Sequence, residues 1–222
     1  MSDQSPILKV QPLTVDESAA ASFKTKYGQG RRKLLEAAAR LVAREGSARL
    51  TLRELAAEAG MGHNSIYRHF QSVEEMLLTL IADFSSELRD GLKQARTRVP
   101  LNEPPSRAVV GWLLDFALAN QDAFVVTVRE RHGPQGPARQ AIEQVERDII
   151  ADMRRDLGAA GHLPSIAEDK LELMLKLIVQ QTFQLCLACI EKPDRRDAIL
   201  VEAQLIFAWC LTGAAVVSGQ AG

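Results

Sequence analysis

The chain has 222 residues, of which 46% are hydrophobic and 25% are charged. This composition supplies enough apolar material for a buried core, and the three cysteines are too few for a disulfide-rich secreted domain. The N-terminus lacks the basic start and apolar run of a signal peptide. No apolar stretch reaches the roughly 20 residues that span a bilayer. We therefore expect a cytoplasmic protein without a membrane partner.

Positive charge is concentrated in one part of the chain, although the formal net charge is only -1. Residues 24–70 hold ten lysines and arginines and four glutamates, whereas the remaining residues hold 17 basic and 24 acidic side chains. Such a division is expected when one domain contacts a polyanion and the other does not.

The elements predicted along the chain are all helices, so the expected fold class is all-α. Residues 1–26 contain two prolines and no periodicity, and we expect a disordered tail there. From about residue 29 onward, apolar residues recur every three or four positions, and no alternating run of β-branched residues is present. Capping residues, glycines and prolines set the predicted helix ends. The predicted helices cover residues 29–45, 51–59, 63–70, 72–98, 106–120, 122–131, 138–157, 167–191 and 195–218.

Two short helices early in the chain carry the most specific signal. Thr51 and Glu54 form a predicted capping box that begins the first, and Gly60-Met61-Gly62 makes a sharp turn before the second. Helices joined in this way cross steeply, so that the second can lie in the major groove of DNA. Ile66 and Phe70 are one turn apart on the second helix, and we expect both to face inward.

The polar side chains of the second helix are the candidate DNA contacts. Those at its N-terminus have the size and hydrogen-bonding groups to reach base edges, and those further along donate to phosphate oxygens. Thr51, at the N-terminus of the first helix, is also well placed for an anion. The predicted base-reading residues are His63, Asn64 and Ser65, and the predicted phosphate contacts are Thr51, Tyr67, Arg68 and His69. Proteins that never contact DNA can share this helical shape, but the positive charge of the same segment favours DNA binding.

Residues 31–77 resemble the DNA-binding region of the TetR family of repressors. The likeness is carried by Thr51-Leu-Arg-Glu-Leu-Ala-Ala-Glu-Ala-Gly60 and by Ser65-Ile-Tyr-Arg-His-Phe70, which fix residue type and spacing across two helices. It implies that a homodimer binds palindromic operator DNA, with Tyr67 and His69 on phosphates. It also implies a C-terminal helical domain that forms the dimer and encloses an effector cavity. The expected domains are a tail over 1–26, a three-helix DNA-binding domain over 27–73, and an effector-binding and dimerisation domain over 74–222.

A second resemblance concerns the effector. Asn120-Gln-Asp-Ala-Phe124 and Arg129-Glu-Arg131, followed by a glycine-rich turn, are similar to the fatty-acid-synthesis repressors FabR and DesT of that family. This likeness implies a small hydrophobic effector, namely a long-chain acyl group carried as a thioester of coenzyme A or of acyl carrier protein. It implies no other cofactor.

Apolar side chains of the C-terminal part are the candidates for lining a tunnel around such an acyl chain. They are Trp112, Phe116, Phe124, Val128, Met174, Ile178 and Phe183. For any one of them, ordinary helix-bundle core is the more frequent reason for such a residue. Arg129 and Arg131 are candidates for binding the acidic headgroup at the tunnel mouth; the alternative is that they fix their helix to its neighbours through ion pairs.

The last two predicted helices are apolar over more than one face, so they must be covered on several sides. Together with their copies in a second chain they would form a four-helix bundle. A fully buried core within one chain is the alternative. The predicted dimer-interface residues are Leu171, Leu175, Leu205 and Trp209.

Cys186 and Cys189 form a C-x-x-C pattern inside an apolar helix, where buried free cysteines are the simplest interpretation. A thiol-based redox sensor that uses both residues is the alternative function. We expect no metal site, because zinc would need two more ligands nearby. No glycine-rich phosphate loop, nucleophile elbow or His-Glu-x-x-His pattern is present, and we expect no enzymatic activity.

Overall fold

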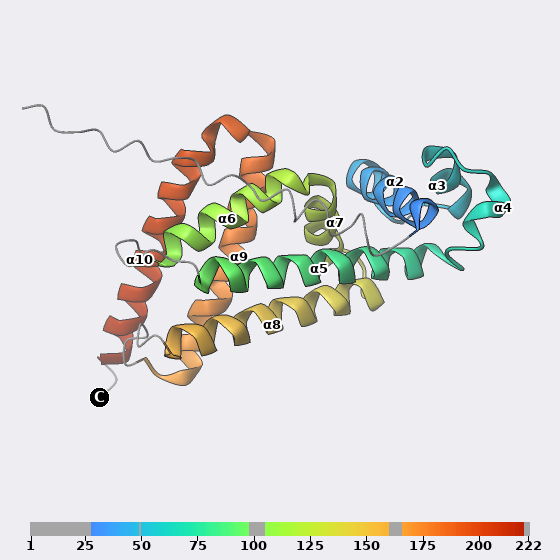
Figure 1. The fold of residues 1–222 in the computed structure, drawn as a ribbon. Coiled ribbons are helices and arrows are strands. Elements are labelled where there is room, and N and C mark those ends of the chain that lie inside the picture. Colours follow the sequence, from blue (N-terminus) through green and yellow to red (C-terminus); the bar gives the residue numbers. More distant parts are fainter. Residues whose placement is uncertain (1–27, 49, 98–104, 160–165, 220–222) are drawn as a thin grey trace, which may run out of the picture.

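The computed structural model describes residues 28–48, 50–97, 105–159 and 166–219. Over these ranges the chain forms helices joined by short connections and has no strand, which confirms the all-α prediction. The predicted tail over 1–26 lies outside the described residues. Figure 1 shows an elongated molecule, with a small group of helices at one end and a larger bundle at the other.

Three of the described helices form the small end of the molecule. They are α2 (Gln29–Glu45), α3 (Leu52–Glu58) and α4 (His63–Ile66). Their apolar faces meet in one N-terminal core, in which Leu35, Leu55 and Ile66 have no exposed surface. Burial of this kind is the main stabilising contribution that so small a group of helices can obtain.

The capping box predicted at the start of α3 is confirmed. The backbone N–H of Glu54 donates to Thr51 Oγ1 (3.2 Å), and the Glu54 carboxylate accepts from the backbone N–H of Thr51 (2.9 Å). At the start of a later helix, Ser72 forms only half of a capping box. Ser72 Oγ accepts from the backbone N–H of Glu75 (3.0 Å), but the Glu75 carboxylate accepts from the backbone of Gln71 (2.7 Å) instead of Ser72.

The helix predicted over 63–70 is shorter in the structure. α4 ends at Ile66, and the chain continues in tight turns, in which the N–H groups of Arg68 and His69 donate to carbonyls three residues earlier. Helix ends often tighten in this way, because the last carbonyl groups lack partners four residues ahead.

The larger bundle contains the remaining helices, whose ends lie within two residues of the predicted ones. They are α5 (Val73–Thr97), α6 (Pro105–Ala119), α7 (Gln121–Arg131), α8 (Pro137–Ala159), α9 (Glu168–Glu191) and α10 (Arg196–Gly219), with a short 3-10 turn, Pro193–Arg195, before α10. The chain bends by 101° between α6 and α7. This bend turns α7 away from the line of α6.

The long helix α5 belongs to both ends of the molecule (Figure 1). Met76 and Leu77 are buried in the N-terminal core, whereas Phe84 and Leu88 are buried in the core of the larger bundle. At 1.5 Å per residue, this helix is about 37 Å long. Because α5 is continuous, a tilt of its bundle end moves the N-terminal core as well.

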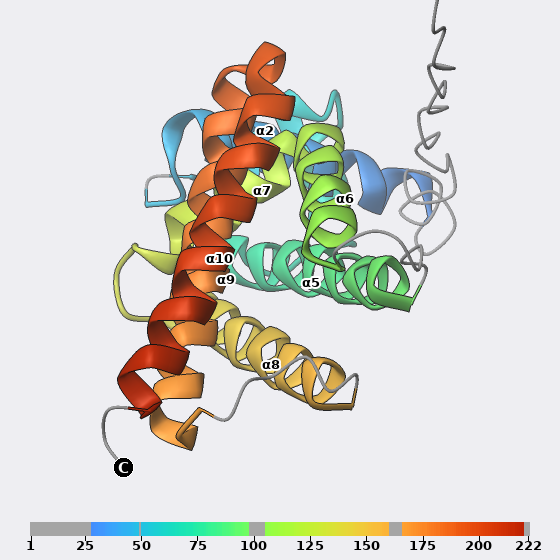
Figure 2. The same ribbon diagram turned by 90° about the vertical axis from the view of Figure 1, so that its left-hand side faces the viewer.

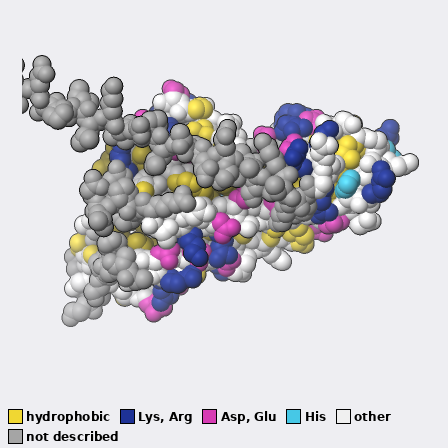
Figure 3. Space-filling model, viewed as in Figure 1, with side chains coloured by type: hydrophobic (Ala, Val, Ile, Leu, Met, Phe, Trp, Pro, Cys, Tyr) yellow, Lys and Arg dark blue, Asp and Glu magenta, His cyan; other side chains and the backbone are white. Residues whose placement is uncertain are grey.

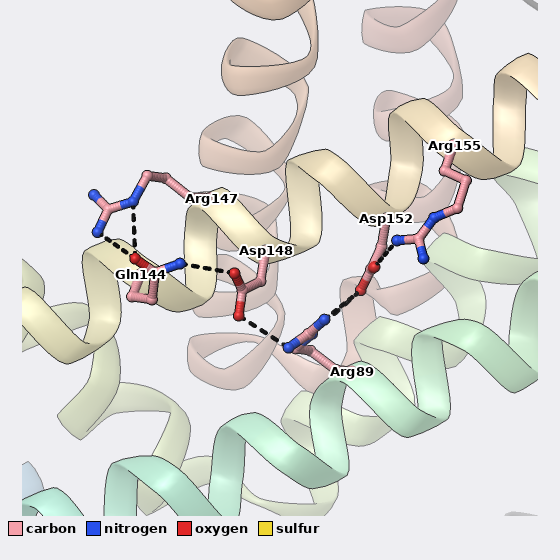
Figure 4. Close-up of polar contacts among 6 residues, drawn as sticks. All are labelled: Arg89, Gln144, Arg147, Asp148, Asp152 and Arg155. Atoms are coloured by element: carbon pink, nitrogen blue, oxygen red, sulfur yellow. Dashed lines mark hydrogen bonds and ion pairs between the residues drawn. The ribbon is translucent and has the colours of Figure 1, made fainter.

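An ion-pair network fixes α5 against α8 (Figure 4). Arg89 of α5 donates to Asp148 (Nη1–Oδ2 2.9 Å) and to Asp152 (Nη2–Oδ2 3.0 Å), which lie one turn apart on α8. Asp152 also pairs with Arg155. Burial alone would raise the pKa of Asp152, but the hydrogen bonds and charges of Arg89 and Arg155 outweigh it and lower that pKa. The ion pairs of Arg89 therefore add to the apolar packing of α5 against α8.

α9 and α10 pack along each other (Figure 2). By length and composition, α9 and the segment Pro193–Gly219 are each long and apolar enough to cross a membrane, so the expectation that no stretch reaches that length is wrong. That expectation counted only the uninterrupted apolar run near the C-terminus, and the helix containing that run begins earlier. Half of the apolar window of α9 is buried in the bundle, against 17% of that of Pro193–Gly219. α10 therefore leaves most of its apolar surface uncovered within one chain.

The close approach of α5 and α6 gives a test of the packing. A Cβ on Gly91 would lie 1.9 Å from the Trp112 ring, so we predict that Gly91→Ala lowers the free energy of unfolding by about 1–3 kcal/mol. Urea unfolding followed by tryptophan fluorescence measures this change. Gly111→Ala is the matched control, because its Cβ would meet nothing closer than 3.8 Å. Equal destabilisation by the two substitutions would contradict the packing described for Gly91.

Candidate functional site

The segment that begins with α4 lies at the end of the molecule remote from α10 (Figure 1). Its side chains at His63, Asn64 and Arg68 are exposed. Tyr67 is 45% exposed, and its ring meets that of His63 edge to face, with 5.3 Å between the ring centroids. Four of the predicted DNA contacts therefore stand on the surface, where a large partner can reach them.

Buried residues support this exposed surface from below. Ile66 and Phe70 have no exposed surface, as their spacing predicted. Arg31 of α2 donates to the carbonyl of His69 (2.8 Å), and its guanidinium carbon lies 4.2 Å from the centre of the Phe70 ring. Gly30 lets the His69 ring approach α2, because a Cβ there would lie 2.9 Å from Nε2. The sequence pattern missed Arg31 and Gly30, since both act across more than 35 residues of chain.

Thr51 is exposed, and its side chain and backbone N–H form the cap of α3. Its Oγ1 donates to Glu54 Oε2 (2.8 Å), and its backbone N–H donates to the same carboxylate. These hydrogen bonds lower the pKa of Glu54, so a negative charge already occupies the N-terminus of α3. A phosphate beside Thr51 would meet that carboxylate. The contact between Thr51 and DNA stays a prediction, and the Glu54 carboxylate beside it would have to be accommodated.

Basic side chains gather on the same end of the molecule, as Figure 3 shows. Lys33, Arg53 and Arg68 are exposed and form no ion pair within the described part of the chain. By contrast, Arg40 is paired with Glu58 (3.2 Å). Cations without an acidic partner keep their full charge for a polyanion, and neutralised ones do not.

A cavity of about 270 Å³ lies where α7, α8 and α9 meet. Its lining residues are Thr127, Val128, Arg131, His132, Ile142, Glu146, Leu177, Gln180, Gln181, Phe183 and Gln184. The volume is close to the lower end of the range for small-molecule sites, roughly 300–1,000 Å³. The sequence prediction missed the glutamines of α9. Three glutamines within five positions of the apolar C-terminal half of α9 were a visible signal of a polar face.

Three of the predicted effector contacts, Val128, Arg131 and Phe183, line this cavity. Arg131 also forms ion pairs with Glu146 (2.9 Å) and Glu143 (3.3 Å) of α8. Arg131 therefore lines the cavity and also joins α7 to α8 through ion pairs. Each of the two alternatives for this residue has an observation in its favour.

The other apolar candidates are core residues in the structure. Trp112 stacks on Phe116, with 5.0 Å between their ring centroids, and Phe124 is buried beside them. Met174 and Ile178 are buried in a separate core between α9 and its neighbours α8 and α10. None of these five residues lines the cavity between α7, α8 and α9.

α7 connects the cavity to the small end of the molecule. Val126 has no exposed surface and belongs to the N-terminal core. Arg129, predicted at a tunnel mouth, instead donates to the carbonyl of Val42 in the last turn of α2 (Nη1–O 2.9 Å). A cation is favourable there, because the C-terminal end of a helix carries partial negative charge. One short helix thus contributes a wall of the cavity and a contact to α2.

Exposed apolar side chains gather on α9 and α10. They are Leu173, Leu177, Val201, Leu205, Trp209, Val216 and Val217. Two of the predicted interface residues belong to this surface, since Leu205 is 48% exposed and Trp209 is 69% exposed.

The other two predicted interface residues, Leu171 and Leu175, are not on this surface. They are 8% and 0% exposed and pack inside a single chain, so their prediction as interface residues is wrong. The exposed face of α9 carries Leu173 and Leu177 instead, each of which lies two positions after a predicted residue. The sequence could not separate the two faces, because both are apolar.

Cys186 and Cys189 are buried in the bundle. Burial raises the pKa of both thiols, and the thiolate is the reactive form of cysteine. The structure therefore gives no support to the redox-sensor alternative. Within the described ranges, no group of three His, Cys, Asp or Glu side chains is placed to hold a metal ion.

Two family profiles match the chain. Residues 34–80 match the profile of bacterial regulatory proteins of the tetR family, and residues 106–211 match that of the tetracyclin repressor-like C-terminal domain. The first match covers most of the small end and the start of α5. The second covers the bundle from α6 into α10.

Solved structures of similar fold include regulators from three bacteria. The fatty acid degradation regulator FadR from Bacillus halodurans has a TM-score of 0.70 at 17% identity, over 85% of this chain and 97% of that chain. A TetR-family regulator from Bordetella parapertussis has a TM-score of 0.66 at 19% identity, over 83% and 95%. FadR from Bacillus subtilis in complex with stearoyl-CoA has a TM-score of 0.63 at 14% identity, over 82% and 97%.

The exposed surface at α4 gives a direct test. We predict that Tyr67→Ala weakens binding to a duplex selected by this protein from random sequences by about tenfold, because a hydrogen bond to phosphate is lost. Fluorescence anisotropy with the labelled duplex measures the affinity. Arg44→Ala is the control, since Arg44 lies at the other end of α2 and is paired with Glu45. Unchanged affinity of the Tyr67 variant, or an equal loss in the control, would contradict the assignment.

Proposed function

Because this chain belongs to the TetR family of bacterial regulatory proteins, we propose that it is a cytoplasmic repressor. As a homodimer it binds palindromic operator DNA, and a small hydrophobic effector controls that binding. The protein is a transcriptional regulator with a DNA-binding and an effector domain. The repressor role, the dimer and the nature of the effector are our proposals.

One observation supports DNA binding above the others. Asn64, Tyr67 and Arg68 stand exposed over a base of fully buried side chains, on the same end of the molecule as cations without acidic partners. A short, firmly supported polar helix of this kind fits a major groove, with the longer side chains on the flanking phosphates.

The apolar surface of α9 and α10 supports a homodimer. Leu205 and Trp209 lie one turn apart on α10, and an exposed apolar stripe of this kind is stabilised by a matching stripe from a second copy. Pairing at this end leaves both α4 segments free. Two recognition helices about 34–36 Å apart reach successive major grooves on one side of DNA.

We propose a long-chain acyl thioester as the effector. The support is the motif around Arg129-Glu-Arg131, the cavity beside the aromatic core, and the structural likeness to FadR proteins, one of them in complex with stearoyl-CoA. Because the aromatic side chains fill the bundle, an acyl chain enters only if rings such as Phe183 and Phe124 move apart.

Such a movement would reach the DNA-binding end through α7 and α5. α7 lines the cavity through Val128 and contacts α2 through Arg129, while α5 runs into the N-terminal core. An effector changes DNA binding only if it binds the two arrangements of these helices unequally.

The effector proposal has a direct test. We predict that palmitoyl-CoA or oleoyl-CoA shifts the operator affinity by a factor of about 5–150, the usual range for coupling between two sites. Anisotropy titrations with and without the thioester measure the shift, and calorimetry measures its binding.

Free coenzyme A is the matched control, and it should shift the operator affinity much less than either thioester because it lacks the acyl chain. If neither thioester gives binding heat or alters operator affinity, the acyl effector is ruled out. Such a result would leave the proposal of operator binding intact, because the affinity of the protein for its operator is measured without a thioester.

A further inference from the structure

The buried part of the cavity between α7, α8 and α9 is mainly apolar. Ile142 and Phe183 are 1% and 8% exposed, and Phe183 packs on Phe124 of the aromatic core with 5.5 Å between ring centroids. Thr127 is buried as well, but its hydroxyl donates to the carbonyl of Ala123 (2.9 Å). The deep end of the cavity therefore suits an apolar group.

The charged side chains around the cavity neutralise one another. Arg131 donates to Glu146 (2.9 Å) and to Glu143 (3.3 Å), and Arg139 also pairs with Glu143 (3.0 Å). The hydrogen bond from Arg139 lowers the pKa of Glu143, which keeps that carboxylate ionised. A phosphate or carboxylate site needs a cation whose hydrogen bonds are still available. Arg131 is therefore already paired and is not a free cation for an anionic ligand.

Glutamine side chains supply the remaining polar groups of α9. Gln180, Gln181 and Gln184 line the cavity, and their side chains make no hydrogen bond within the described ranges. Gln180 is partly buried, whereas Gln181 and Gln184 are exposed. A glutamine amide both donates and accepts hydrogen bonds. Its natural complement is an uncharged group with the same capacity, such as another amide.

We propose that this cavity binds the uncharged, amide-bearing pantetheine arm that joins an acyl chain to its carrier. The acyl end points toward Phe183, and the phosphates of the carrier stay outside. This inference rests on the proposed acyl-thioester effector and specifies which part of it the glutamines recognise. Coenzyme A and acyl carrier protein share the same arm. A simple pantetheine thioester therefore contains all the groups that the cavity is proposed to recognise.

The first experiment compares ligands on the full-length protein by calorimetry. We expect palmitoyl-pantetheine and palmitoyl-CoA to bind within roughly tenfold of each other, and palmitate, which has no amide, to bind more weakly than either. Palmitate binding as tightly as palmitoyl-pantetheine would overturn the proposal. Tighter binding of acylated carrier protein than of palmitoyl-CoA identifies the protein as the carrier, and the reverse order identifies coenzyme A.

The second experiment changes the glutamines. The double variant Gln180→Leu, Gln184→Leu should bind palmitoyl-pantetheine about tenfold more weakly, because hydrogen bonds to the ligand amides are lost. Gln140→Leu is the matched control, since Gln140 is exposed on α8 outside the cavity and should have no effect. Thermal unfolding verifies that each variant is folded.

A third variant separates an amide site from a phosphate site. Gln184→Lys adds a cation to the cavity, and the proposal predicts the same ratio of affinities for palmitoyl-CoA and palmitoyl-pantetheine as in the parent protein. Selective strengthening of palmitoyl-CoA binding would overturn the proposal. Absence of any thioester binding contradicts the proposed effector itself, whereas undiminished binding by the double glutamine variant contradicts only this inference.

Discussion

The position of α7 is the constraint on which the rest of the molecule depends. This helix has only 11 residues, yet its side chains enter the N-terminal core at Val126, enter the bundle core at Phe124, and line the cavity at Val128. The 101° bend from α6 makes this possible, because it aims α7 at the C-terminal end of α2. Any ligand that moves the cavity wall must also move a residue of the other core.

The two ends of the molecule have opposite surface chemistry, and the proposed function needs both. At one end, polar and basic side chains around Tyr67 stand over a small, well-filled core. At the other, α10 exposes apolar side chains such as Trp209. Exposure of such an apolar surface to water is unfavourable, so a second copy that covers this surface stabilises the pair. The continuous helix α5 joins the two ends, and Arg89 on this helix forms ion pairs with Asp148 and Asp152 of α8.

Much of the fold followed from the sequence, because helix ends are set by local signals. Caps and breakers such as Thr51, Gly60 and Pro193 act within a few residues, and periodicity placed Ile66 and Phe70 inward. The failures at Arg129 and at the predicted interface residues of α9 depend on contacts between distant segments. Nothing near Arg129 in sequence indicates that it reaches α2. Because α9 has two apolar faces, the sequence alone does not show which of them is buried by neighbouring helices.

The most direct test of the role of α7 is a double-mutant cycle on operator affinity that needs no effector. Gln180→Trp fills the cavity with a side chain of this protein, and Arg129→Ala removes the contact with Val42. If α7 carries the state of the cavity to α2, the tryptophan changes operator affinity in the parent protein, and this change is largely lost when Arg129 is also replaced. The same change in both backgrounds, or no change in the parent protein, would contradict the account.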